Sequence, residues 1–315
     1  MEDQRSAFER ALDAHPVLLT DGGIETEIMF ATDYEMDPHL QVGAMVVEER
    51  GEGLLRDLYG SYVAAAEPAG LPIVIGTPTF RASQNFAEAA GREGDVAAIN
   101  RAAVAQHRSL AEAASTDVFV AGVIGPARDA YRPEDALDAE SARRYHSEQA
   151  GLLAMAGADF LFAATFPAVE EAVGAGRAMA ATGLPAVVSL VLGEDGCVLD
   201  GTQLAVAVAE LDERVGPGLL YVSLSCIHTG AAAVALAATP EPARSRIREL
   251  KANGSPKPTA ELVRLHHLES DPPPVFAERI WSIHERFGLQ VIGGCCGTGP
   301  AHIAALAALA AGRGR

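Results

Sequence analysis

Positive charge is scarce in this chain. Its 315 residues include 24 lysines and arginines against 42 aspartates and glutamates, which gives a formal net charge of −18. A surface this acidic repels phosphate backbones and anionic lipid headgroups. We therefore expect no nucleic acid and no membrane as a partner, and a small molecule as the substrate.

Long apolar runs and targeting signals are also missing. No stretch approaches the roughly 20 apolar residues that a transmembrane helix needs. The first ten residues, MEDQRSAFER, are charged throughout and contain no signal-peptide core. Only four cysteines occur, and so few do not make a disulfide framework in a chain of this length. The sequence therefore predicts a protein of the reducing cytoplasm. Its oligomeric state is left open, a homo-oligomer included.

No segment rich in proline, glycine or serine divides the chain into parts. Hydrophobic residues make up 49% of the sequence, and this length is ample for one large core. We expect a single domain over residues 1–315, with a frayed tail after about residue 311.

Short β-branched runs recur along the chain, and they are nearly all apolar instead of alternating. Strands that are buried on both faces have this composition. An eighth run near Ile247–Lys251 has a poorer pattern. The clear runs are Val17–Leu19, Ile73–Ile75, Val118–Ile124, Phe160–Ala163, Ala186–Leu190, Leu220–Leu224 and Gln290–Ile292.

Alanine-rich segments with helical periodicity lie between these runs. Examples are Ala87–Ala114, Ser141–Ala156, Glu170–Ala181 and Thr202–Leu211. A strand and a helix alternate about eight times, which predicts an α/β fold of the single (β/α)8 TIM-barrel type. The alternative is a doubly wound open sheet, which is weakened because no G-x-G-x-x-G motif follows the first strand.

Polar and glycine-containing motifs follow the predicted strands. In a (β/α)8 barrel all strand ends of this kind lie on one rim, where active sites are built. Glu25 and Glu27 in the first motif suit the first turn of a helix. The motifs are Thr20–Glu27, Gly76–Phe80, Gly125–Pro126, Ala164–Phe166, Cys226 and Gly294–Gly297.

Two adjacent cysteines lie among glycines in the segment VIGGCCGTGP, residues 291–300. Neighbouring side chains of a regular strand point to opposite faces. Flanking glycines can adopt positive φ, and this freedom would let the sulfurs of Cys295 and Cys296 converge. Cys226 offers a third thiolate from the end of the sixth strand. Three thiolates and one vacant position describe a catalytic zinc site instead of a closed structural one.

Two other protein classes remain open from the cysteines alone. One is a redox sensor in which Cys295 and Cys296 oxidise, although adjacent cysteines form strained disulfides and Cys226 would then have no role. The other is a non-catalytic barrel that holds zinc structurally. Cys197, in GEDGC, is expected to be a loop thiol without a role.

The motifs together resemble those of the homocysteine S-methyltransferases, which are zinc-dependent barrels that methylate a thiol. The resemblance implies that Cys226, Cys295 and Cys296 are the zinc ligands and the catalytic residues. The expected substrate contacts are Asp21, Gly22, Thr77 and Thr165. The matching segments are Asp21–Gly23 with Thr26–Glu27, Thr77–Phe80, Gly125–Pro126, Gly157–Asp159, Asp200–Gly201, Cys226 and Gly293–Gly297.

The chain departs from the family at two positions. The family has a glutamate after the fourth strand that helps to hold the amino group of homocysteine, and Ala164 stands there. Pro78 replaces an asparagine in the second-strand motif, whereas Asp21, also expected near the amino group, is kept. Homocysteine, giving methionine, is the first choice of acceptor. The alternative is a thiol or selenol that lacks the α-amino group.

The cysteine ligands suit methyl transfer to sulfur. A free thiol with a pKa near 8.5 is mostly protonated at neutral pH, and a divalent cation makes a bound thiol ionise. Three thiolate ligands keep a fourth, substrate thiolate rich in electrons. A sulfonium donor such as S-methylmethionine or S-adenosylmethionine then needs only in-line placement against that sulfur.

Overall fold

Eight parallel strands form a closed barrel in the computed structural model, which describes residues 5–257, 261 and 267–313. Each strand pairs with the next, and β8 pairs with β1. The predicted (β/α)8 TIM-type barrel is confirmed, and the open sheet is excluded. The strands are β1 Leu18–Thr20, β2 Ile73–Gly76, β3 Val118–Ile124, β4 Phe160–Phe166, β5 Ala186–Leu190, β6 Leu219–His228, β7 Ile247–Asn253 and β8 Val291–Gly294.

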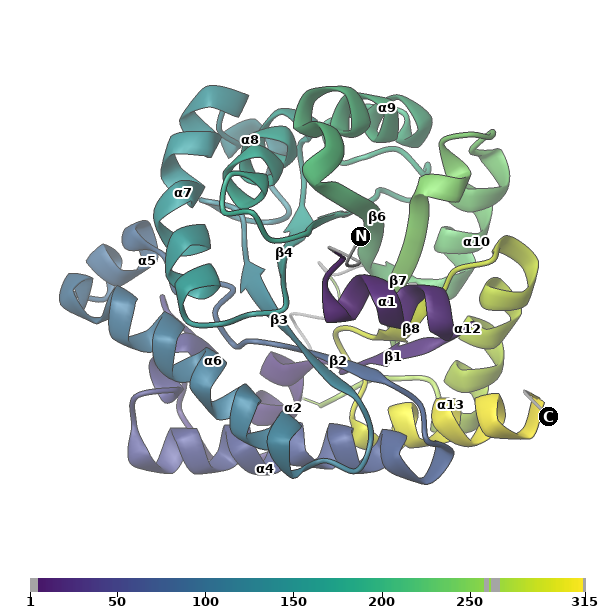
Figure 1. The fold of residues 1–315 in the computed structure, drawn as a ribbon, viewed down its shortest axis with the longest axis horizontal. Helices are drawn as coiled ribbons and strands as arrows, with labels where there is room; N and C mark the ends of the chain where they lie inside the picture. The colour runs from purple at the N-terminus through teal and green to yellow at the C-terminus, as the bar shows by residue number, and fades with distance from the viewer. Residues whose placement is uncertain (1–4, 258–260, 262–266, 314–315) are drawn as a thin grey trace.

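Helices surround the strands as an outer layer (Figure 1). Among the described residues, none of them combines the length and apolar character needed to cross a membrane. The helices are α1 Ala7–Ala14, α2 Ile24–Ala31, α3 Val42–Met45, α4 Glu49–Ala66, α5 Gln84–Ala89, α6 Val96–Ala113, α7 Ala139–Met155, α8 Val169–Ala180, α9 Leu204–Val215, α10 Thr229–Ala238, α12 Pro273–Phe287 and α13 Pro300–Arg313.

The predicted helix over Ala87–Ala114 is divided in the structure. Helix α5 ends at Ala89, and Gly91 follows with a φ of 66°. A residue in this left-handed region stops an α-helix, and glycine adopts it without a steric penalty. Helix α6 then begins at Val96. At the other end of the chain, α13 continues to Arg313, past residue 311 where the tail was expected to begin.

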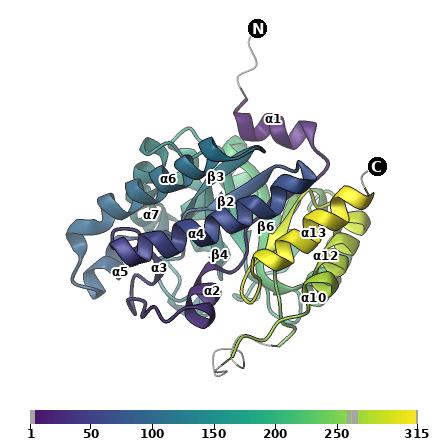
Figure 2. The ribbon, with the colours of Figure 1, turned by 90° about the horizontal axis from the view of Figure 1, so that it is seen from below.

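Helix α1 closes one end of the barrel. It lies across that end in Figure 2, and its Phe8 is fully buried. The ring of Phe8 stacks on that of Phe160 with centroids 4.1 Å apart, and it lies 5.3 Å from the ring of Phe119. Both partners stand at the starts of their strands, β4 and β3. The amino-terminal end of the barrel is therefore plugged by aromatic packing, and the opposite rim is left for a site.

Candidate metal centre and active site

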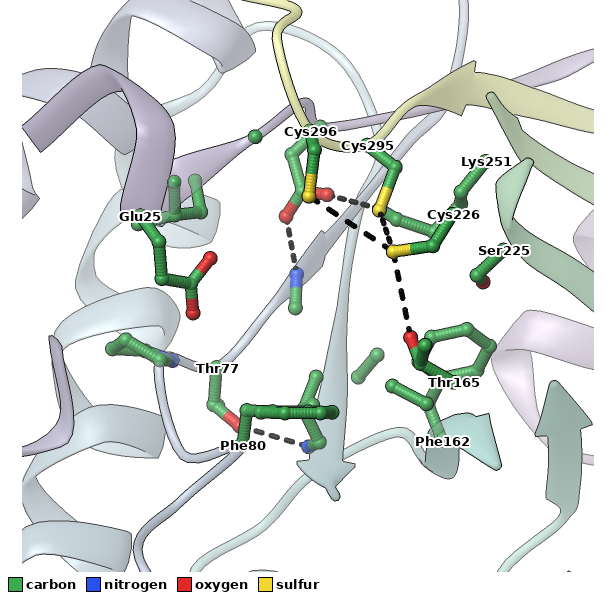
Figure 3. Close-up of a pocket in the computed structure, with 18 of the residues that line it drawn as sticks. Glu25, Thr77, Phe80, Phe162, Thr165, Ser225, Cys226, Lys251, Cys295 and Cys296 are labelled. Carbon is green, nitrogen blue, oxygen red and sulfur yellow. Dashed lines mark hydrogen bonds and ion pairs between the residues drawn. The ribbon is translucent and has the colours of Figure 1, made fainter. Parts of the chain in front are cut away.

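Three cysteine sulfurs converge on the carboxyl-terminal rim of the barrel. Cys226 belongs to β6, and Cys295 and Cys296 directly follow β8 (Figure 3). The Sγ of Cys226 lies 2.9 Å from that of Cys295 and 4.0 Å from that of Cys296. All three sulfurs lie within 4.8 Å of one another. Cys197 is not part of this group. The structure therefore brings together the three cysteines that the sequence singled out.

The expected positive φ occurs on one side of the cysteine pair only. Gly297, directly after Cys296, has a φ of 81°, whereas Gly293 and Gly294 do not have positive φ; Cys226, at 54°, does. The β6–β7 register shifts at Cys226, which is a bulge that turns this residue out of the regular strand. A non-glycine residue at positive φ is strained and is found mostly at functional positions.

Gly293 and Gly294 are needed for space instead. A Cβ on Gly293 would collide with the side chain and carbonyl of Thr20, and a Cβ on Gly294 would lie 2.8 Å from the Cβ of Thr298. Real Cβ atoms do not approach that closely. The glycines thus allow the cysteine loop to pack directly on β1 and on the start of the last helix.

The charge state of the thiols shows why a metal ion fits. Hydrogen bonds from the Cys295 and Cys296 thiols lower the pKa of Cys226 well below its usual range. The hydrogen bond with Cys226 raises the pKa of Cys295 to about 12 and that of Cys296 well above its usual range. The three sulfurs alone therefore favour a single negative charge. Full ionisation needs a cation between them, and thiolates are ligands for soft metal ions.

A cavity of 310 Å³ opens beside the sulfurs. Its polar side is formed by the segment that follows β1, by β6 and β7, and by the cysteine loop. Residues of β2, β3 and β4 form an apolar side, on which Val74, Ala121, Val123, Phe160 and Phe162 lie. The cavity is large enough for a small substrate but not for a macromolecule. Cys226, Cys295 and Cys296 line this cavity, so they could hold a metal ion beside the space for a substrate.

Comparison with known proteins decides the family. The family model for homocysteine S-methyltransferases matches residues 18–310. The chain belongs to this family. It is accordingly an enzyme of the homocysteine-type S-methyltransferase class. Neither a redox sensor nor a barrel with structural zinc explains the match to this family. No curated protein matches the chain.

Solved structures of a family member share the fold. The metallated form of the Escherichia coli homocysteine methyltransferase MmuM has a TM-score of 0.75 and 24% identity, covering 96% of this chain and 99% of that chain. The oxidized form of the same protein has a TM-score of 0.75 and 25% identity, with coverage of 95% and 98%.

All four expected substrate contacts of the methyltransferase line the cavity: Asp21, Gly22, Thr77 and Thr165. The Oγ1 of Thr165 lies 3.8 Å from the Sγ of Cys226. The hydroxyl of Thr77 accepts a hydrogen bond from the Val123 N–H at 2.9 Å, so part of its bonding capacity is used within the barrel. Contact of these residues with substrate stays a prediction.

Asp21 is engaged by a residue that sequence reasoning missed. The Nζ of Lys251, on β7, donates to the Asp21 carboxylate and, at 3.1 Å, to the Thr20 hydroxyl. The Gly76 N–H donates to the other Asp21 oxygen at 2.7 Å. Burial alone would lower the pKa of Lys251, but the Asp21 and Glu249 carboxylates outweigh it and raise this pKa. Lysine and aspartate therefore form a buried ion pair at the cavity wall.

Glu249 is a second missed residue. Burial raises the pKa of its carboxyl to about 7, although the charge of Lys251 opposes this shift. The Glu249 side chain is 3% exposed, and its Oε2 has no hydrogen-bond partner in the described part of the chain. Glu249 and Lys251 are two residues apart on one strand, so both face the barrel interior. Two charged residues at this spacing in a predicted strand were the sequence signal that could have identified Glu249 and Lys251.

Proposed function

We propose that this enzyme transfers a methyl group from a small sulfonium donor, S-methylmethionine or S-adenosylmethionine, to the thiolate of homocysteine, giving methionine, with zinc as its cofactor. The convergence of three cysteine sulfurs beside a cavity carries this proposal. When bound, zinc supplies the positive charge that keeps a fourth sulfur ligand ionised at neutral pH.

The three cysteines set the charge of the centre. As thiolates they carry three negative charges, which exceed the two positive charges of zinc, so an acceptor sulfur stays rich in electrons. Neutral histidine ligands would leave the ion more acidic and suit the activation of water. Thr165, beside Cys226, is placed to orient one of the ligands.

The cavity walls hold the two reactants and limit water. A thiolate and a sulfonium lose their opposite charges as the methyl group moves, so a site with little water favours the transition state over the separated ions. Phe162 and Val123 provide an apolar surface in the cavity that the sulfurs also line. Alignment of donor carbon and acceptor sulfur at about 3–3.5 Å then contributes most of the catalysis, without a general acid or base.

A methyl-transfer assay on zinc-loaded enzyme tests this function. Homocysteine is paired with each sulfonium donor, and methionine is quantified by mass spectrometry. Formation of methionine by the wild-type enzyme and its loss in Cys296→Ala are expected. Absence of transfer from both donors, with one zinc bound per chain, would contradict the proposal.

Two observations favour a second class of acceptor. Ala164 lines the cavity without offering a carboxylate, and Asp21 is already paired with Lys251. A thiol or selenol without an α-amino group would need neither residue. The assay therefore includes 4-sulfanylbutanoate, which is homocysteine without its amino group; a preference for this thiol would identify the second class.

A further inference from the structure

The carboxylates that line the cavity differ in what they already bind. Asp21 accepts hydrogen bonds from Lys251 and from the Gly76 N–H. Glu249 is buried close enough to Lys251 to feel its charge. Asp129 accepts a hydrogen bond from the backbone of its own loop, at Tyr131. Glu25 is the remaining carboxylate of the cavity lining.

Glu25 points into the cavity from the first turn of α2. Figure 3 shows its carboxylate directed toward the space in front of the sulfurs. In the described part of the chain, no hydrogen bond or ion pair joins this carboxylate to another side chain. Burial raises the pKa of Glu25, and the nearby charges of Cys295 and Asp21 add to this, while a hydrogen bond from the Glu25 backbone and the charge of Arg81 oppose it only partly. A carboxylate held this way is poorly satisfied until a cation reaches it.

An anionic ligand does not fit beside Glu25. The centre formed by three thiolates and a divalent cation carries a net negative charge, and Glu25 adds a second one. A cation of the substrates fits instead. The reaction offers two candidates, which are the sulfonium of the donor and the α-ammonium group of the acceptor.

The chemistry of the two cations favours the ammonium group. An ammonium group has N–H donors that must find an acceptor when they are buried, and a carboxylate provides one. A sulfonium has no such donors, and its charge disappears as the methyl group is transferred. A carboxylate against the sulfonium would thus stabilise the ground state more than the transition state and slow the reaction.

We propose that Glu25 binds the α-ammonium group of the acceptor and so replaces the carboxylate that is absent at Ala164. This inference rests on the proposed methyl transfer to a thiol. It places the amino group on the α2 side of the cavity, away from β4. Glu25 is then a determinant of acceptor specificity. It compensates for the carboxylate that is absent at Ala164 and for Asp21, which is held by Lys251.

The test compares two acceptors with two variants. Initial rates are measured for homocysteine and for 4-sulfanylbutanoate with wild type, Glu25→Gln and Glu25→Asp, at saturating donor. A charged hydrogen bond of ordinary strength predicts that Glu25→Gln lowers kcat/KM for homocysteine by about 10- to 100-fold and for 4-sulfanylbutanoate by less than about 3-fold. Glu25→Asp, which keeps the charge, should recover part of the loss.

Glu27→Gln is the matched control. Glu27 belongs to the same helical turn and is half-buried against Gly299, but it does not line the cavity. This variant removes the same charge from α2 and should leave the preference between the two acceptors unchanged. Equal losses for both acceptors in Glu25→Gln would overturn the inference and assign Glu25 to the donor. A wild-type preference for 4-sulfanylbutanoate would overturn it as well.

Calorimetric binding separates this inference from the proposed function. Homocysteine and 4-sulfanylbutanoate are titrated into zinc-loaded protein without a donor. Glu25→Gln should weaken homocysteine binding by about 10-fold or more and leave the other thiol unaffected. If no methyl transfer occurs with any pair, the proposed function fails while this selective weakening still supports Glu25. An unchanged homocysteine affinity in Glu25→Gln overturns the inference whether or not the enzyme turns over.

Discussion

Replacing Lys251 by methionine should destabilise the protein by removing one partner of a buried ion pair. The side chains of Lys251 and Asp21 are 14% and 4% exposed. Methionine keeps much of the apolar stem and removes the charge, so the Asp21 carboxylate stays buried and, among the described residues, keeps only the Gly76 N–H as a hydrogen-bond donor. The same change removes the cation that opposes the raised pKa of Glu249.

The expected magnitude follows from the burial of the pair. Breaking a buried pair by removing one partner costs about 3–5 kcal/mol, and the hydrogen bond that Asp21 keeps places Lys251→Met near the lower value. Unfolding entropy of about 2.1 cal/mol/K per residue gives about 0.66 kcal/mol/K for a chain of this length. A loss of about 3 kcal/mol thus lowers Tm by about 5 °C. Asp21→Asn should lower the free energy of unfolding by less, because the Glu249 carboxylate still lies near the Lys251 ammonium group.

A double-mutant cycle provides the assay. Guanidinium and thermal unfolding are measured at pH 7.5 for zinc-loaded wild type, both single variants and the double variant. The double variant leaves no unpaired charge of this pair. Its free energy of unfolding should therefore be about 2 kcal/mol higher than the value expected from adding the two single losses. Additivity within about 0.5 kcal/mol would refute the ion pair as a stabilising unit.

Three further predictions concern the metal centre and its surroundings. Cys296→Ala should lose zinc on dialysis against a chelator, measured by metal analysis, whereas Cys197→Ala should retain it. Gly294→Ala should weaken zinc binding at least about 10-fold in a chelator competition, because its Cβ would displace Thr298. The carboxyl of Glu249 has a pKa of about 7 in the folded protein, above the 4.5 of an unperturbed glutamate, so stability should fall by about 3 kcal/mol as pH rises from 4.5 through 7. Glu249→Gln should remove most of this fall in unfolding measured at several pH values; an unchanged pH profile would contradict it.

The frame of the barrel could be predicted because strands buried on both faces are almost entirely apolar. Val118–Ile124 and Ala186–Leu190 are strands with the predicted bounds. The ends of β4 and β6 were predicted too short. Both strands contain a non-glycine residue with positive φ, at Thr165 and Cys226, and local sequence preferences do not indicate such a conformation.

The cysteines of the site could be predicted, but the charges around them could not. Adjacent cysteines among glycines have few structural explanations, so their convergence with Cys226 followed from the barrel alone. The bond between Lys251 and Asp21 joins residues 230 positions apart, and it depends on the closure of the sheet. A pairing of this kind is a property of the folded barrel and has no local sequence signal.

The aromatic plug under the barrel has a consequence for kinetics. Since Phe8 and the rings beneath it close the amino-terminal end, both substrates and both products must pass through the same mouth. In the proposed reaction the acceptor sulfur lies at the cysteines, and the donor enters between it and the mouth. Turnover should therefore follow an ordered sequential scheme in which the acceptor binds first and the methylated thiol leaves last.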